Sequence, residues 1–127
     1  LFKTRWGAFY QTGLEGFLRG RDINTLVFLG CNYPNCPRTS IYEASERDFK
    51  IMLVTDAISQ LYPKGEEEMS NIGVRLCSSD YLGQLLLAGK FIPSFVMVDA
   101  AQPIMLHVTG RFFWVKLGGT DRETMPL

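Results

Sequence analysis

The sequence predicts an α/β protein with three layers, α/β/α, built on a mainly parallel, Rossmann-like sheet. Two observations carry this prediction. From Leu14 to Leu87, short continuous apolar runs alternate with amphipathic segments, which is the pattern of parallel βαβ units. The apolar runs show no apolar–polar alternation, so they are typical of strands covered on both faces. Right-handed crossovers between such strands place helices on both sides of the sheet.

The first half of the pattern predicts a helix, a strand and a second helix. Gly13–Gly20 is expected to be a short helix with one apolar side, followed by a polar link at Arg21–Asn24. Thr25–Gly30 (TLVFLG) is the first buried strand. Pro37–Asp48 is expected to be a helix that turns its charged residues, Glu43 among them, to solvent.

The second half repeats the alternation. Gly73 is placed to stop a helix in the left-handed conformation, and Ser78 or Ser79 is placed to cap the last helix. Pro and Gly between Asp56 and Gly65 are interpreted as breakers. The expected elements are, in order, a strand at Lys50–Thr55, a loop at Asp56–Gly65, a helix at Glu66–Ile72, a strand at Val74–Cys77 and a helix at Asp80–Ala88.

The chain changes character after Gly89, so residues 90–127 are expected to be an extension of unknown role. Ser94–Val98 and Met105–Val115 have the composition of strands, and Thr109–Arg111 could turn a hairpin between strands. The tail from Gly118 onward is polar and is expected to be mobile.

Composition excludes several classes of partner. The chain has 127 residues, thirteen basic and thirteen acidic, so its net charge gives no reason to expect nucleic acid or an anionic membrane. No apolar run is long enough to cross a bilayer, and the first residues do not resemble a signal peptide. Three cysteines and a single histidine, His107, do not form a familiar zinc set, so we expect no metal and no cofactor. The odd cysteine count favours a reducing, cytoplasmic location.

Cys36 is the strongest candidate for chemistry. It follows a buried strand and opens a helix, with Asn35 at a favourable N-cap position and Pro37 in the first turn. At a helix N-terminus the macrodipole favours a thiolate, and unpaired backbone N–H groups there can bind an oxyanion. Packing of Cys36 as a small residue against the sheet is an equally good alternative.

Other candidates are weaker when taken alone. The simplest interpretation of Lys3 is a solvated surface residue. Asp56 ends a strand on the same sheet edge as Cys36, but capping of a turn or helix is the favoured role for it. His107 could serve Cys36 as a base, although a structural role is favoured. Arg38 could bind an anionic group or pair with an acidic neighbour.

Three stretches taken together resemble a known family. Lys3–Leu14 follows the pattern K-x-x-x-S-A-F-x-x-T-x-L, with Gly7 in place of the serine. Gly30–Cys36 follows G-x-x-T-x-x-C, with tyrosine in place of the threonine, and Lys50–Ala57 ends in the pair Asp-Ala. These patterns are similar to those of the isochorismatase-like cysteine hydrolases, which include nicotinamidases and N-carbamoylsarcosine amidases. The resemblance covers Lys3 to Ala88.

The resemblance implies a function and a site. Family members cleave small molecules, mostly at amide-type C–N bonds, with a catalytic triad of Asp, Lys and Cys. Here Cys36 would be the nucleophile and Lys3 the lysine. A non-proline cis peptide is implied between Cys31 and Asn32, with the backbone N–H groups of Asn32 and Cys36 forming the oxyanion hole. The candidates for the substrate pocket are Phe9, Tyr33 and Arg38.

The resemblance also implies what this chain lacks. The family's Asp lies on a first strand that precedes the lysine segment, so residues 1–89 correspond to the C-terminal part of the domain, without its first strands. Cys36 would then lack its base, and we expect weak activity or none from this chain. We expect a small-molecule substrate and a homo-oligomer. Two alternatives stay open: a non-catalytic interaction or oligomerisation module, and a redox-sensing thiol at Cys36.

Overall fold

The computed structural model describes residues 3–88, 95–99, 108–109 and 112–116. Within these residues the chain forms a six-stranded sheet in the order β3-β2-β1-β4-β6-β5. All neighbouring strands are parallel except β5 and β6. The strands are β1 (Thr25–Gly30), β2 (Lys50–Ile58), β3 (Arg75–Cys77), β4 (Phe95–Asp99), β5 (Val108–Thr109) and β6 (Phe112–Lys116).

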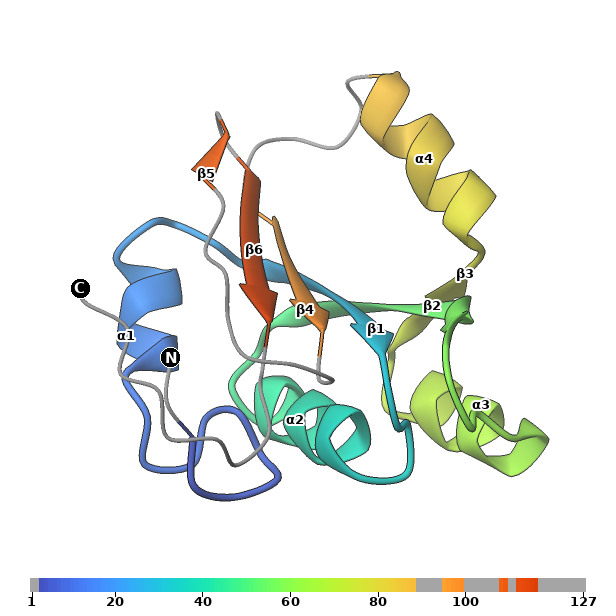
Figure 1. The fold of residues 1–127 in the computed structure, drawn as a ribbon, viewed down its shortest axis with the longest axis horizontal. Coiled ribbons are helices and arrows are strands. Elements are labelled where there is room, and N and C mark those ends of the chain that lie inside the picture. Colours follow the sequence, from blue (N-terminus) through green and yellow to red (C-terminus); the bar gives the residue numbers. More distant parts are fainter. Residues whose placement is uncertain (1–2, 89–94, 100–107, 110–111, 117–127) are drawn as a thin grey trace.

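Four helices of the described part cover the sheet on two sides. They are α1 (Leu14–Arg19), α2 (Cys36–Ser45), α3 (Pro63–Asn71) and α4 (Ser79–Leu87). Figure 1 shows α1, α2 and α3 on one side of the sheet and α4 on the other. This confirms the predicted three-layer α/β/α arrangement with a mainly parallel sheet.

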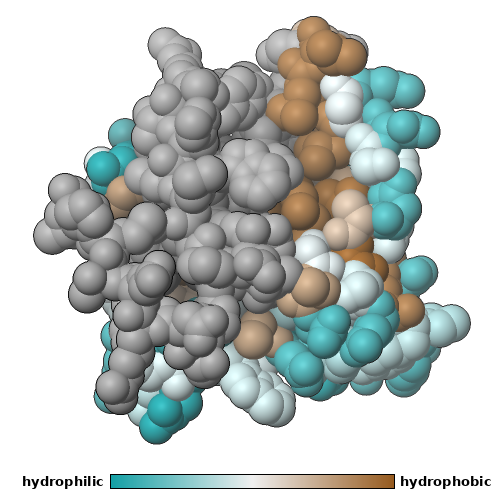
Figure 2. All heavy atoms as spheres, viewed as in Figure 1, coloured by the Kyte–Doolittle hydropathy of each residue, from teal (hydrophilic) through white to brown (hydrophobic). Residues whose placement is uncertain are grey.

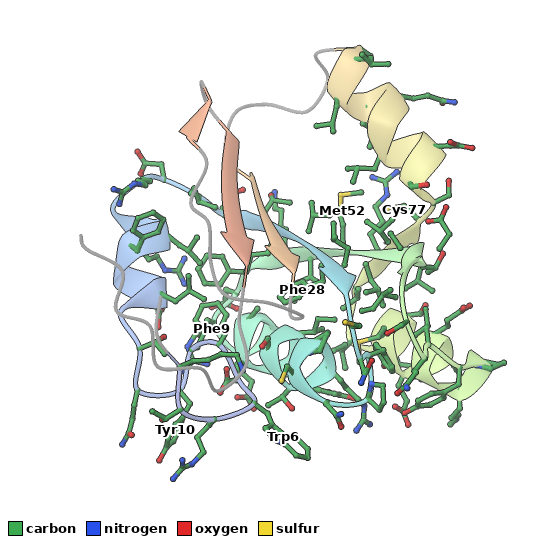
Figure 3. All side chains as sticks on the ribbon, viewed as in Figure 1. Trp6, Phe9, Tyr10, Phe28, Met52 and Cys77 are labelled. Carbon is green, nitrogen blue, oxygen red and sulfur yellow. The ribbon has the colours of Figure 1, made fainter. Side chains whose placement is uncertain are left out.

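The core is divided between the two faces of the sheet. Alternate residues of each central strand enter different clusters, so Phe28 packs with α1, α2 and α3 while Val27 and Met52 pack with α4. In Figure 3, Phe28 and Met52 lie on opposite faces. Both faces of β1 and β2 are therefore buried, which explains their continuous apolar sequence. Figure 2 shows hydrophobic surface running along α4 beside hydrophilic surface.

The predicted loop at Asp56–Gly65 is the clearest error in the expected elements. Strand β2 continues to Ile58, where it pairs with Gly30 across an irregularity in the register. Pro63 begins α3 instead of breaking it, because a proline at the first helical position loses no hydrogen bond. The helix stop at Gly73 is confirmed by its φ of +82°, and so is the cap at Ser78, whose side chain accepts a hydrogen bond from the Tyr81 N–H.

Strand β4 occupies a central place beside β1. It pairs with β1 on the side opposite β2, with Leu29 in register with Asp99. The predicted hairpin agrees with the antiparallel pairing of Thr109 with Phe112, while its turn and the tail from Gly118 lie outside the described residues. No helix in the described part of the chain is long and apolar enough to cross a membrane.

Candidate active site

The turn that carries Cys36 connects β1 to α2 at the carboxyl edge of the sheet. It is fastened to the end of β2 by two backbone hydrogen bonds: the Ser59 N–H donates to the Gly30 carbonyl at 2.8 Å, and the Tyr33 N–H donates to the Ser59 carbonyl at 2.9 Å. The peptide bond between Cys31 and Asn32 is cis, as the family resemblance implied. Cys36 is the first residue of α2, which confirms the predicted position.

Lys3 and Cys36 meet in this structure. The Lys3 Nζ lies 3.5 Å from the Cys36 Sγ, and both side chains are half-buried. The same ammonium donates to the carbonyls of Arg5, at 2.8 Å, and Trp6, at 3.2 Å. Two backbone acceptors therefore hold the ammonium of Lys3 against the sulfur.

Two side chains of α2 that the sequence analysis missed hold the Lys3 segment in place. The Ala8 N–H donates to the Ser40 Oγ at 3.0 Å, and the Phe9 N–H donates to the Glu43 Oε2 at 2.8 Å. The expectation that Glu43 faces solvent is wrong, because its carboxylate is used by the backbone of this segment. A polar residue about two turns into an amphipathic helix gives no local signal for such a contact.

The contact with Glu43 also explains the glycine at position 7. A Cβ atom on Gly7 would collide with the Glu43 carboxylate, so any larger residue would displace it. The departure of Gly7 from the family's serine is therefore matched to the position of Glu43.

The predicted oxyanion donors lie at the exposed side of the turn. Among the described residues, neither the Asn32 N–H nor the Cys36 N–H donates a hydrogen bond to the protein, so both are free to bind an anionic oxygen. The Asn32 side chain accepts from the Ser59 hydroxyl at 3.0 Å. Asn35 occupies the N-cap position as predicted, but its side chain makes no capping hydrogen bond.

Two of the three pocket candidates lie in the core. Phe9 is buried, with its ring 5.7 Å from that of Phe49. Tyr33 is 0% exposed, and its hydroxyl donates to the Gly65 carbonyl at 3.2 Å. Burial raises the pKa of the Tyr33 phenol to about 12. The structure gives both rings a packing role, and a contact of either with substrate stays a prediction.

The third candidate, Arg38, is paired. Its guanidinium contacts the Glu68 carboxylate of α3 at 2.8 Å, and this hydrogen bond raises the pKa of Arg38. The Arg38 Nε is buried without a hydrogen-bond partner among the described residues. A substrate anion would therefore compete with Glu68 for this side chain.

Asp56 takes the capping role. Its carboxylate accepts from the Ser79 N–H at 2.8 Å and from the Ser79 hydroxyl at 2.7 Å, at the start of α4. These hydrogen bonds hold the pKa of the Asp56 carboxyl below its usual range. His107 lies outside the described residues. No group of three or more potential metal ligands is found in the part of the chain that the structure describes.

The surface hollow found among the described residues lies away from Cys36. It has a volume of about 420 Å³ and is lined at the amino ends of β1 and β2 by residues that include Thr25, Lys50 and Arg75. The hollow is therefore on the opposite edge of the sheet from the Cys36 turn. Ligands of parallel sheets bind outside the carboxyl ends of the strands, which is the edge of Cys36.

The mainly parallel sheet thus carries a cysteine at the start of the helix after a central strand, with a lysine ammonium at its sulfur. The model of the isochorismatase domain matches residues 1–79, and the chain belongs to this family. It is 34% identical over 80 residues to a "Probable inactive nicotinamidase" of Arabidopsis thaliana, covering 59% of this chain and 41% of that protein. It is 33% identical over 66 residues to ureidoacrylate amidohydrolase of Methylorubrum extorquens, covering 52% of this chain and 27% of that protein.

A solved structure shows the same fold. N-carbamoylsarcosine amidase from Thermoplasma acidophilum superimposes with a TM-score of 0.58 at 29% identity, covering 61% of this chain and 46% of that one. The chain therefore spans less than half the length of these relatives.

Proposed function

We propose that this chain is a cysteine hydrolase that cleaves the C–N bond of a small amide through a covalent intermediate on Cys36. The observation that supports it is the 3.5 Å contact between the Lys3 Nζ and the Cys36 Sγ at the N-terminus of α2. The same sulfur therefore lies at a helix N-terminus and beside an ammonium, two positive partners for the charge that develops during the reaction.

The reaction follows from the position of these groups. The Cys36 thiol gives its proton to solvent water as the sulfur attacks the amide carbon, and the carbonyl oxygen becomes an oxyanion that the Asn32 and Cys36 N–H groups bind. Collapse of this intermediate breaks the C–N bond, and the amine leaves with a proton taken back from water. Water then attacks the thioester, which releases the acid and restores the thiol. Lys3 keeps its charge throughout and stabilises the sulfur.

The substrate class is suggested by the relatives. Ureidoacrylate amidohydrolase and N-carbamoylsarcosine amidase are both named for hydrolysis of a C–N bond in a small molecule, whereas the Arabidopsis relative is named a probable inactive nicotinamidase. A non-catalytic module is not favoured, because such a module would have no need for a lysine ammonium in contact with the Cys36 sulfur. Turnover is expected to be weak, because no carboxylate among the described side chains contacts Cys36 or Lys3.

The test is turnover on the substrates for which these relatives are named: nicotinamide, ureidoacrylate and N-carbamoylsarcosine. Release of ammonia is measured, and Cys36→Ala is the decisive variant. Turnover should be abolished in Cys36→Ala and kept in Cys31→Ala, the matched control, because Cys31 is a half-buried thiol of the same turn. Mass spectrometry of quenched reactions should find the acyl adduct on the Cys36 peptide. Full turnover by Cys36→Ala would refute the proposal, and reversible sulfenic acid without turnover would favour the redox alternative.

A further inference from the structure

The place of the Lys3 ammonium at Cys36 depends on how the segment that carries the lysine, residues 3–9, is attached to α2. The two carbonyls that accept from the ammonium, those of Arg5 and Trp6, belong to the same segment. They hold the ammonium within the segment and do not determine the distance between the Lys3 Nζ and the Cys36 Sγ. Contacts that cross from residues 3–9 to α2 have to set that distance.

Three polar contacts among the described residues join this segment to one face of α2. They follow the same order along the segment and along the helix: Lys3 with Cys36 at 3.5 Å, the Ala8 N–H with the Ser40 Oγ at 3.0 Å, and the Phe9 N–H with the Glu43 Oε2 at 2.8 Å. The three helix positions are four and three residues apart, so they fall within about 60° of one another around the helix axis. One face of α2 therefore carries the sulfur at its start and, further along, two acceptors for the backbone of the lysine segment.

Glu43 makes the stronger of the two backbone contacts. Its carboxylate accepts from the Phe9 N–H, and a hydrogen bond to a carboxylate is stronger than one between neutral groups. The same carboxylate also fills the space over Gly7, since a Cβ atom on Gly7 would collide with it. One side chain of α2 therefore fits the segment at two positions, four and six residues after Lys3.

We propose that Glu43 is a positioning residue for the reaction at Cys36, which holds the Lys3 ammonium at the sulfur through its contacts with Phe9 and Gly7. This inference rests on the proposed function. In this role Glu43 touches no substrate and exchanges no proton, and it acts on the sulfur only through Lys3. The competing role is structural: a Glu43 that only stabilises the fold would affect Cys36 equally with and without the Lys3 ammonium.

The experiment measures the rate at which iodoacetamide labels Cys36 near neutral pH in the unaltered chain, Glu43→Ala, Lys3→Ala and the double variant. Tandem mass spectrometry assigns the label to Cys36 and not to Cys31, because both cysteines lie on one tryptic peptide. Loss of a hydrogen bond to a charged acceptor shifts an equilibrium by about tenfold or more, so Glu43→Ala should slow labelling by most of the factor that Lys3→Ala causes. In the Lys3→Ala background the same substitution should change nothing.

Further variants separate the hydrogen bond from other effects of Glu43. Glu43→Gln keeps an acceptor oxygen for the Phe9 N–H and should keep the labelling rate of the unaltered chain. Gly7→Ala leaves the carboxylate in the chain but displaces it, so it should slow labelling as Glu43→Ala does. The matched control is Glu46→Ala, which removes an exposed carboxylate at the C-cap of α2 and should leave the rate in place.

The labelling rates decide the inference without any measurement of turnover. Equal slowing by Glu43→Ala in both backgrounds overturns it, and so does an unchanged rate in Glu43→Ala or in Lys3→Ala. A rate in Glu43→Gln as slow as in Glu43→Ala overturns the role of the hydrogen bond. Far-UV circular dichroism checks that each variant folds, and if Glu43→Ala does not, Gly7→Ala with and without Lys3→Ala decides. Turnover by Cys36→Ala overturns the proposed function instead, and with it the place of Glu43 in a reaction.

Discussion

Replacement of Tyr33 by phenylalanine and by alanine tests whether this residue is a core anchor or part of a substrate pocket. The ring is fully buried, so Tyr33→Ala should destabilise the protein by about 3–5 kcal/mol, the usual cost of deleting a buried aromatic ring. Tyr33→Phe removes only the hydrogen bond to the Gly65 carbonyl, which can still accept its helical hydrogen bond in α3, and should cost about 1 kcal/mol.

Substitution of Gly65, which lies against the Tyr33 ring, gives a sharper test. A Cβ atom on Gly65 would lie 2.7 Å from the Tyr33 Cε1 and 3.1 Å from its Cζ and Oη. Such overpacking costs about 1–3 kcal/mol, against which the better helix propensity of alanine returns up to about 1 kcal/mol. Gly65→Ala should therefore destabilise the unaltered chain. In the Tyr33→Ala background the ring is gone, and the same substitution should stabilise the protein.

Urea denaturation followed by far-UV circular dichroism measures these differences, and a thermal midpoint should move by about 4 °C per kcal/mol for a chain of this size. The unaltered chain, Tyr33→Ala, Gly65→Ala and the double variant form a double-mutant cycle for Tyr33 and Gly65. Equal costs of Gly65→Ala in both backgrounds would refute the packing argument. Equal costs of Tyr33→Phe and Tyr33→Ala would show that the hydroxyl, not the ring, carries the contact.

The titration of Tyr33 gives the same contact a pH dependence. Burial raises the pKa of its phenol from 10.0 to about 12, so the folded state favours the neutral form. The stability from this group is fully present below pH 10 and is lost as pH rises toward about 12. The difference in unfolding free energy between the unaltered chain and Tyr33→Phe should therefore shrink over that range.

Three further predictions use other contacts. Asp56→Asn should flatten the acid side of the stability curve, because hydrogen bonds from Ser79 lower the pKa of Asp56, and the stability they provide is lost as pH falls through that pKa. Lys3→Ala should slow iodoacetamide labelling of Cys36 near neutral pH, because it removes the ammonium that lies 3.5 Å from the sulfur; an unchanged rate would remove Lys3 from the site. Gly73→Ala should cost about 1 kcal/mol in urea denaturation from its positive φ alone, because its Cβ would meet open space, and a larger loss would contradict this.

Local sequence was enough for most of the secondary structure of the described residues. The buried strands were predicted because their side chains face apolar surroundings on both sides, which removes polar residues from the run. Where β2 passes Thr55 the burial of its side chains becomes irregular and Asp56 is exposed, so its last residues could not be distinguished from a loop. Pro63 shows the same limit, because proline is compatible both with a turn and with a first helical position.

Patterns in the sequence were enough to predict the class of fold, the position of Cys36 at a helix start and, through the family's motifs, the contact of Cys36 with Lys3. These depend on residues close together in the chain or on short motifs. Tertiary structure decided which side chains hold the site. Glu43 turned inward to bind a backbone N–H, and Tyr33 became part of the core. It also decided that β4 pairs with β1. Pairing between distant strands depends on the packing of the whole sheet, and no local periodicity encodes it.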